Sequence, residues 1–256
     1  MAEHPNTENV IEIKALKNRL GAHWVHDGLN LNVNKSEIIA VIGPSGCGKT
    51  TLMRSILMLL KPTSGTIKVF DTDVVRCTAL QALAVQRRWG VMFQSSALFS
   101  SLQVLENVMF PIGEYAQLKK TRQKELALLK IALTGLELAA ATKYPAELSG
   151  GMKKRAALAR AIALDPELVF LDEPTAGLDP KGAGDMDDLI LHLRDSLGLT
   201  FFMITHDLDS LWRVPDRVVF LGEGKVLAAL PMRELVTQTH PLIQDYLSGV
   251  RAYERA

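Results

Sequence analysis

A short apolar run that leads directly into a glycine-rich loop restricts the fold of this chain more than any other feature. The run IIAVIG, residues 38–43, has no polar side chain, which is typical of a strand buried on both faces. The loop GPSGCGKTT, residues 43–51, follows it, and a helix is predicted from Lys49 to Leu60. The order of strand, glycine loop and helix predicts an α/β domain with a phosphate-binding loop.

The chemistry of this loop depends on its residue types and their spacing, which match G-x-x-x-x-G-K-S/T. Glycines let backbone N–H groups approach phosphates, and the start of the helix adds its positive dipole end. Lys49 is expected to reach the β- and γ-phosphates, and the Thr50 hydroxyl is expected to hold Mg²⁺. The predicted nucleotide-binding residues of the loop are Gly43, Pro44, Ser45, Gly46, Cys47, Gly48, Lys49, Thr50 and Thr51.

The rest of the chain alternates between strand-like and helix-like patterns. Alternating apolar and polar residues at 10–15 and 29–34 predict a small antiparallel sheet near the N-terminus. Helical periodicity dominates from about residue 100 to 165, including a predicted helix over Met152–Ala163. Further strands are predicted at residues 66–70, 89–93, 167–174, 200–207 and 217–230. A helical insertion is therefore expected to interrupt an α/β domain.

Composition excludes several classes of function. The formal net charge is +1, so the chain lacks the basic field that binds nucleic acid without sequence preference, and we expect no nucleic-acid partner. No apolar stretch approaches the roughly 18 to 20 residues of a membrane span, and no secretory signal is visible. We expect a cytoplasmic chain in which Cys47 and Cys77 are free thiols.

An acidic motif, LVFLDE at residues 168–173, predicts a buried strand that ends in two carboxylates. Asp172 is the candidate for the Mg²⁺ side, and Glu173 is the candidate general base that polarises the attacking water. Alone, such a run is more often a plain strand end, but the phosphate loop in the same chain favours the catalytic interpretation. The long separation between Lys49 and Asp172 argues against a small GTPase or a nucleoside kinase.

A second glycine motif raises the question of what it binds. Ser149, Gly150 and Gly151 precede a predicted helix, so they offer a hydroxyl, backbone N–H groups and a positive dipole end. One nucleotide needs only one such cradle, which leads to the prediction that this cradle serves the ATP of a second copy in a two-fold pair. The alternative is a plain N-cap serine with a flexible glycine pair.

Taken in order, these motifs resemble those of the ATP-binding cassette (ABC) ATPases over about residues 10–230. GPSGCGKTT is similar to their Walker A motif, LSGGM to their signature and LVFLDE to their Walker B motif. The resemblance implies that Gln94 in MFQSS is the Q-loop glutamine and that Asp179 in AGLDP belongs to the D-loop. It also implies that His206 in MITHD, a lone histidine after a buried strand, is the switch residue that contacts the γ-phosphate.

The resemblance implies an α/β fold with a P-loop NTPase (RecA-like) core, an N-terminal antiparallel β subdomain and an inserted α-helical subdomain. One domain is expected over residues 1–256, with the core at about 8–95 and 162–230, the helical signature subdomain at about 96–161 and a tail at about 231–256.

The implied activity is ATP hydrolysis by a homodimer, with ATP and Mg²⁺ as cofactors. The implied metal ligands are Thr50, Gln94 and Asp172, and the implied catalytic residues are Glu173, His206 and Gln94.

Two positions depart from the family pattern. Met152 replaces the usual final glutamine of the signature, which leaves the serine and glycine donors in place. The aromatic ring that stacks on adenine is not evident, because Asn18, Arg19 and Leu20 stand where it is expected. Trp24 lies a few residues later, either near the base or in the core.

Finer features resemble the Mla-type ATPases, which serve lipid transporters with MCE-domain proteins. The resemblance rests on MFQSSALFSSLQVLENVMFP, on the block from signature to D-loop and on the tail HPLIQDYLSGVRAYERA. It implies phospholipid transport at the cytoplasmic face of the inner membrane, with an integral-membrane permease and an MCE-domain substrate-binding protein as partners. Alternatives are a cassette ATPase of an importer or exporter for another substrate, and a non-transport cassette ATPase.

An apolar segment follows Gln94 and includes Leu98, Phe99, Leu102 and Val104. If some of these side chains face solvent, they form a patch suited to a cytoplasmic helix of the permease. The alternative is that all four lie in the core of the helical subdomain.

Overall fold

The computed structural model describes residues 8–248, which form two compact units. Unit 1 contains the described residues up to Val85 and from Phe202 onward, and unit 2 contains Gln86–Phe201. The last part of the tail pattern, Gly249 to Ala256, lies outside the described residues.

An antiparallel sheet begins unit 1, as predicted. Its strands, in spatial order, are β2 (His23–Asn34), β1 (Asn9–Leu20), β4 (Ser64–Val69) and β5 (Thr72–Asp73). Ile13 of β1 lies opposite Leu31 of β2 and Ile67 of β4, and all three are buried. The register of β1 with β2 shifts around Ala15, whose φ is 47°. Pairing resumes after this irregularity and continues to Leu20, so the strands are longer than predicted.

The strand before the glycine loop is β3 (Ile38–Ile42), and all five of its residues are buried. It pairs in parallel with β9 (Arg217–Gly222), which pairs antiparallel with β10 (Lys225–Leu230). β3 leads through the loop into α1 (Lys49–Ile56). The predicted strand, loop and helix are therefore present in unit 1.

Helix α1 is shorter than the predicted span to Leu60. Met58 has a left-handed φ of 59°, which ends the helical path, and the N–H groups of Leu59 and Leu60 both donate to the Arg54 carbonyl at 2.8 and 3.1 Å. These bonds satisfy a carbonyl at the end of the helix without another helical turn.

The C-terminal part of unit 1 contains three short helices: α7 (Leu208–Arg213), α8 (Met232–Leu235) and α9 (Pro241–Ser248). The Tyr246 ring of α9 meets Phe220 of β9 edge to face, with centroids 5.4 Å apart. Two further elements, α2 (Ala79–Gln86) and β8 (Thr200–Ile204), contain the boundaries between the units.

Unit 2 contains a parallel pair of strands, β6 (Trp89–Met92) and β7 (Leu168–Asp172). Arg88 and Glu167, which immediately precede the two strands, form a two-pronged ion pair with a shortest distance of 2.6 Å. β7 is followed by the long helix α6 (Pro180–Leu197).

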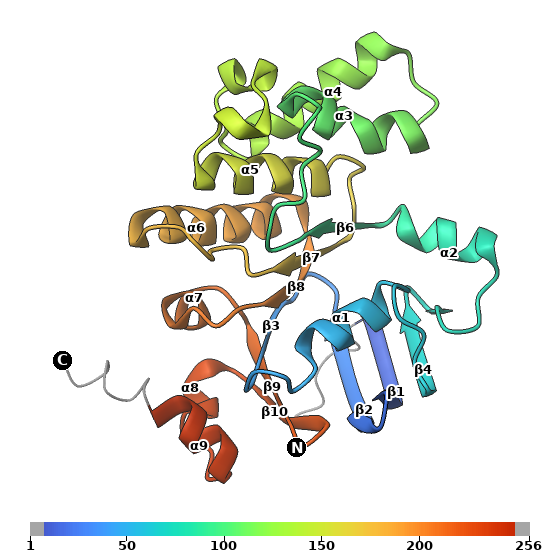
Figure 1. Cartoon of the computed structure of the whole chain (residues 1–256), viewed down its shortest axis with the longest axis vertical. Coiled ribbons are helices and arrows are strands. Elements are labelled where there is room, and N and C mark those ends of the chain that lie inside the picture. The colour runs from blue at the N-terminus through green and yellow to red at the C-terminus, as the bar shows by residue number, and fades with distance from the viewer. Residues whose placement is uncertain (1–7, 249–256) are drawn as a thin grey trace. The chain divides into compact units, whose positions relative to one another are not determined.

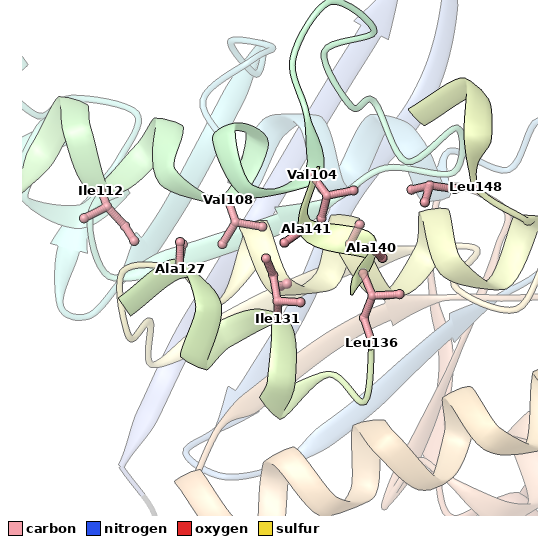
Figure 2. Packing of buried hydrophobic residues seen from close by; sticks show 12 residues of the cluster. Val104, Val108, Ile112, Ala127, Ile131, Leu136, Ala140, Ala141 and Leu148 are labelled. Atoms are coloured by element: carbon pink, nitrogen blue, oxygen red, sulfur yellow. The ribbon is translucent and has the colours of Figure 1, made fainter. Parts of the chain in front are cut away.

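The predicted helical segment of unit 2 consists of α3 (Val104–Tyr115), α4 (Lys120–Leu133), η1 (Leu138–Thr142), η2 (Pro145–Glu147) and α5 (Gly150–Ala161). The three α-helices pack against one another (Figure 1). Figure 2 shows their buried apolar cluster, with Val104, Val108 and Ile112 from α3 facing Ala127 and Ile131 from α4. Within residues 8–248, none of the helices has both the length and the apolar character needed to cross a bilayer.

Candidate functional site

The glycine loop of unit 1 adopts a backbone conformation in which residues other than glycine would be strained. Gly43, Gly46 and Gly48 have φ values of 143°, 81° and 104°. A Cβ atom at Gly43 would lie 2.3 Å from the Leu221 carbonyl oxygen, and one at Gly48 would lie 2.5 Å from His26 Nε2. Both the backbone conformation and the lack of space therefore require glycine at these two positions.

Lys49 begins helix α1, and its ammonium folds back onto the loop that precedes it. Lys49 Nζ donates to the carbonyls of Gly43 at 2.6 Å and Pro44 at 3.1 Å. Its distance to Cys47 Sγ is 3.9 Å, and the Cys47 thiol is free, as is that of Cys77. The lysine ammonium and the first N–H groups of the helix thus lie at one helix N-terminus, and both are donors of the kind that a phosphate site requires.

A buried polar network that no sequence motif indicated supports this loop. Asn18 Nδ2 donates to His26 Nδ1 at 3.0 Å and to Ser55 Oγ at 3.1 Å, and Ser55 Oγ donates to the Thr51 carbonyl at 2.9 Å. Burial lowers the pKa of His26 to about 4, so the ring is neutral near pH 7. Because Nδ1 accepts, the proton is on Nε2, which lies 2.5 Å from the Cβ position of Gly48.

Trp24 is half exposed, which excludes a position in the core. Its ring lies 5.6 Å from the guanidinium carbon of Arg19 and 5.8 Å from Lys17 Nζ. Asn18, by contrast, is 1% exposed and belongs to the support of the loop. Of the residues considered near the expected adenine position, Trp24, Arg19 and Leu20 are therefore the exposed ones.

His206 is exposed and follows the fully buried strand β8, as predicted. The next residue, Asp207, caps α7 by accepting hydrogen bonds from the N–H groups of Asp209 and Ser210 at 3.1 and 3.3 Å. This cap fixes the turn that presents His206. The role of His206 at a γ-phosphate stays a prediction.

In unit 2 the two acidic candidates follow each other where β7 ends. Asp172 is the last residue of the strand, and Glu173 has a left-handed φ of 52°. Both are half-buried. The break in backbone conformation between them ends the alternation of the strand, so the two carboxylates are positioned separately.

Ser149 is the N-cap of α5, and its hydroxyl accepts from the Met152 N–H at 3.3 Å. Ser149 and Gly150 are exposed, and a Cβ at Gly150 or Gly151 would meet no atom closer than 3.8 Å. The capping role of Ser149 is therefore present, and the start of the helix is open to an anion. Binding to the ATP of a second copy stays a prediction.

Gln94 lies just after β6 with its side chain exposed, and a lysine of the signature helix holds its backbone. Lys154 Nζ donates to the carbonyl of Gln94 at 2.8 Å and to that of Glu173 at 2.7 Å. Burial lowers the pKa of Lys154, and the nearby carboxylates of Glu173 and Asp172 oppose that shift. The structure thus brings two predicted catalytic residues together through a third residue that was not predicted.

One signal in the sequence points to Lys154. It stands three, four and seven residues before Ala157, Leu158 and Ala161, which places it on the buried face of α5. A lysine on such a face needs polar partners within the fold.

Asp179, the D-loop candidate, is exposed and caps α6, where its Oδ1 accepts from the Gly182 N–H at 2.8 Å. Its contact with a nucleotide stays a prediction.

The apolar segment after Gln94 is divided between core and surface. Val104 is buried in the helical cluster and Leu98 packs against it, whereas Phe99 is 44% exposed. The side chain of buried Asn107 holds this loop, because its Oδ1 accepts from the Phe99 N–H at 2.8 Å and its Nδ2 donates to the Phe99 carbonyl at 3.1 Å. The alternative that placed all four apolar residues in the core is wrong for Phe99.

Solved structures of similar fold are ATP-binding cassettes. The chain superposes on the cassette MJ0796, solved as a dimer bound to ADP and Pi, with a TM-score of 0.79 and 28% identity over 87% of this chain and 99% of that one. For cbiO1 from Clostridium perfringens, part of the transporter complex cbiONQ, the TM-score is 0.82 with 26% identity over 97% and 100% of the two chains.

Curated relatives match along almost the whole chain. MlaF of Haemophilus influenzae, an intermembrane phospholipid transport system ATP-binding protein, is 39% identical over 94% of this chain and 91% of its own length. The mkl protein of Mycobacterium leprae, a probable ribonucleotide transport ATP-binding protein, is 33% identical over 94% and 69%.

The family model for the ABC transporter matches residues 26–176, which run from the buried His26 past the glycine loop, the signature and the two acidic residues. This match covers more than half of the chain. The chain therefore belongs to the ABC transporter family, as an ATP-binding and ATP-hydrolysing subunit.

Proposed function

We propose that the chain powers phospholipid trafficking across a bacterial envelope. The observation that carries this proposal is the 39% identity with a phospholipid-transport ATP-binding protein over 94% of the chain. A transporter for another substrate is the second candidate, because a relative matched over the same share of the chain is named for ribonucleotide transport.

ATP binds, in this proposal, along the loop from Gly43 to Thr51. Lys49 exchanges its bonds to the Gly43 and Pro44 carbonyls for bonds to the β- and γ-phosphates. This exchange favours binding because the ammonium and the phosphate oxygens carry opposite charges, whereas the two carbonyl groups carry no net charge. The N–H groups at the start of α1 supply the remaining donors.

The metal is proposed to be Mg²⁺, which neutralises charge on the phosphates when bound. Thr50, Gln94 and Asp172 offer a hydroxyl, an amide oxygen and a carboxylate, and hard oxygen donors of this kind suit Mg²⁺. Glu173 accepts a proton from the attacking water as general base, and His206 stabilises charge that develops on the γ-phosphate.

Two copies of the chain are proposed to share each ATP. Ser149, Gly150 and Gly151 of one copy contact the phosphates bound by the loop of the other copy, and Asp179 lies beside them at the same interface. The exposed N-terminus of α5 supports this arrangement, because it offers a hydroxyl and open N–H groups to an anion. The dimer of the similar cassette MJ0796 supports it as well.

An integral-membrane permease is the proposed partner at the surface around Phe99. The Phe99 and Phe110 rings lie 4.9 Å apart and are 44% and 47% exposed. Beside Phe110, a pocket of about 360 Å³ is lined in part by Met109 and Gly113. Exposed aromatic pairs of this kind suit an amphipathic helix.

We also propose that the chain works at the cytoplasmic face of the inner membrane with an MCE-domain protein as a further partner, and without nucleic acid. The proposed organisation remains one ABC ATPase domain with a helical signature subdomain at about residues 96–161.

Affinity purification tests this function. The tagged full chain is isolated from detergent-solubilised bacterial membranes, and the proteins and lipids that accompany it are identified by mass spectrometry. Recovery of a permease, an MCE-domain protein and phospholipid is expected. A permease without an MCE-domain protein or phospholipid would favour the second candidate, and the absence of any membrane partner would contradict a transport function.

The Phe99→Ala variant tests the docking surface in the same experiment. Loss of the permease from the purified complex is expected, because the exposed ring pair is broken. The matched control is Leu129→Ala, which removes a similarly exposed apolar side chain from α4. Retention of the permease by Phe99→Ala would contradict the proposed surface.

A further inference from the structure

Two cations of α5 hold the backbone of the segment that carries Gln94. Lys154 Nζ donates to the Gln94 carbonyl at 2.8 Å. Six residues farther along the helix, the Arg160 guanidinium donates to the carbonyls of Ser96 at 3.0 Å and Ala97 at 2.7 Å. The signature helix therefore contacts this segment at two points, through a lysine and an arginine side chain.

The residues held in this way have unusual backbone conformations. Ser96, Ala97 and Glu173 have φ values of 63°, 44° and 52°, all in the left-handed region. This region is unfavourable for a residue with a side chain, because the Cβ atom comes too close to a backbone carbonyl oxygen. Such conformations persist where the surrounding structure determines them, and each of these three residues gives its carbonyl to Lys154 or Arg160.

Packing alone does not explain the lysine at position 154. It is 5% exposed on the face that also buries Ala157, Leu158 and Ala161, where an apolar side chain would avoid the cost of removing an ammonium from water. What distinguishes Lys154 from an apolar residue is that it donates to two carbonyls at once, those of Gln94 and Glu173.

We propose that Lys154 is a positioning residue for ATP hydrolysis, which fixes the backbones of Gln94 and Glu173 relative to each other and to the signature helix. One ammonium joins the two residues, so a displacement of the segment that carries Gln94 changes the placement of the Glu173 carboxylate. Arg160 fastens the rest of the segment to the same helix. The inference rests on the catalytic roles proposed above for Gln94 and Glu173.

Substitution by methionine tests the proposal, because methionine keeps most of the length of the side chain and removes its donors. The matched control is Lys130→Met. Lys130, on α4 of the same unit, is 4% exposed and forms an ion pair with Asp165. It is therefore a buried lysine whose ion pair does not involve Gln94 or Glu173. Lys154→Arg serves as the conservative variant, because it retains charge and donors. The steady-state ATPase rate, the ATP dissociation constant and the midpoint of thermal unfolding are measured on each full-length protein.

For Lys154→Met we expect kcat to fall about 10- to 100-fold, because small misplacements of catalytic groups have effects of this size. The dissociation constant for ATP is expected to stay within about twofold, because Lys154 does not belong to the glycine loop. Lys154→Arg should keep a higher kcat than Lys154→Met. Lys130→Met should lower thermal stability and leave kcat near the wild-type value.

Hydrogen exchange supplies a readout of the backbone itself. Amides of residues 94–98 should exchange faster in Lys154→Met than in Lys130→Met, because a bond that holds this segment is missing. A kcat for Lys154→Met no lower than that of Lys130→Met would overturn the proposal, and so would a loss that appears only in ATP affinity.

The Glu173→Gln variant separates failure of this inference from failure of the roles on which it rests. If Glu173→Gln hydrolyses ATP at the wild-type rate, the role of Glu173 is wrong. If Glu173→Gln is inactive but Lys154→Met behaves like Lys130→Met, only the positioning role is wrong.

Discussion

His26 is a buried neutral imidazole beneath the glycine loop, and its titration gives stability a pH dependence. Its pKa is lowered from 6.5 to about 4, so between these values the unfolded chain binds the proton and the folded chain does not. The stability conferred by the neutral ring is complete above about pH 6.5 and is lost as the pH falls toward 4. At pH 5 the loss amounts to about 2 kcal/mol.

The His26→Gln variant should therefore be less sensitive to acid than the wild type. The free energy of unfolding, measured in denaturant at pH 7.5 and pH 5, should differ between the two pH values by about 2 kcal/mol less in the variant. His23→Gln is the control, because His23 is exposed on the same hairpin. An unchanged pH dependence in His26→Gln would show that the ring does not titrate as its burial indicates.

Glu173 carries the most direct prediction at the site. Glutamine has nearly the same shape but cannot accept a proton, so Glu173→Gln should bind ATP and hydrolyse it about 100- to 10,000-fold more slowly. With ATP retained, the two copies should stay together, and size-exclusion chromatography with ATP should show a dimer. Hydrolysis near the wild-type rate would remove Glu173 from the role of base.

At the scale of single elements, the hairpin between β9 and β10 has a strained backbone at its turn. Gly222 pairs with Lys225, so the turn consists of Glu223 and Gly224, whose φ values are 52° and 72°. Two-residue turns with both φ values positive favour asparagine followed by glycine. Glutamate at the first position is therefore disfavoured by its side chain.

Glu223→Asn should raise the free energy of unfolding by about 0.5 to 1 kcal/mol, because asparagine tolerates this conformation better. Glu223→Val should have the opposite effect, since a β-branched residue is an outlier at positive φ. Chemical denaturation of both variants checks the prediction. Equal stability of the asparagine and valine variants would contradict a cost that arises from φ.

At the same scale, the sequence predicted elements where a pattern is local. The apolar run before the loop predicted β3, and the 3.6-residue period predicted the helices between Val104 and Ala161. Element ends were less accurate. Helix α1 ends at Ile56 because Met58 turns left-handed, and β1 continues past the irregularity at Ala15. Neither residue is a glycine, so no turn signal marked these places.

Residues whose role depends on distant partners escaped prediction. Lys154 stands in the basic stretch KKR, and His26 precedes the strand predicted at residues 29–34, so neither belongs to a motif. Their partners, Gln94 and Asn18, come from other elements, and only the folded chain brings them within hydrogen-bond distance. The family motifs, by contrast, are contiguous, so the candidate residues could be named from the sequence even though their contacts with nucleotide are still proposals.

At the scale of the whole molecule, the proposed dimer assigns the two glycine motifs of one chain to two different nucleotides, and mixing inactive variants tests this directly. Lys49→Ala disables the loop, and Gly151→Asp places a negative charge at the start of α5, so each variant alone should hydrolyse little ATP. If each site uses the loop of one copy and the signature of the other, a mixed dimer contains one site with both defects and one intact site. An equal mixture that exchanges subunits freely forms mixed dimers half of the time, so about a quarter of wild-type activity should return if the sites act independently.

Measuring the ATPase activity of the mixture against each variant checks this, with unmixed Lys49→Ala at the same total concentration as the control. No recovery, despite exchange demonstrated by differently tagged chains, would contradict two independent sites shared between the copies.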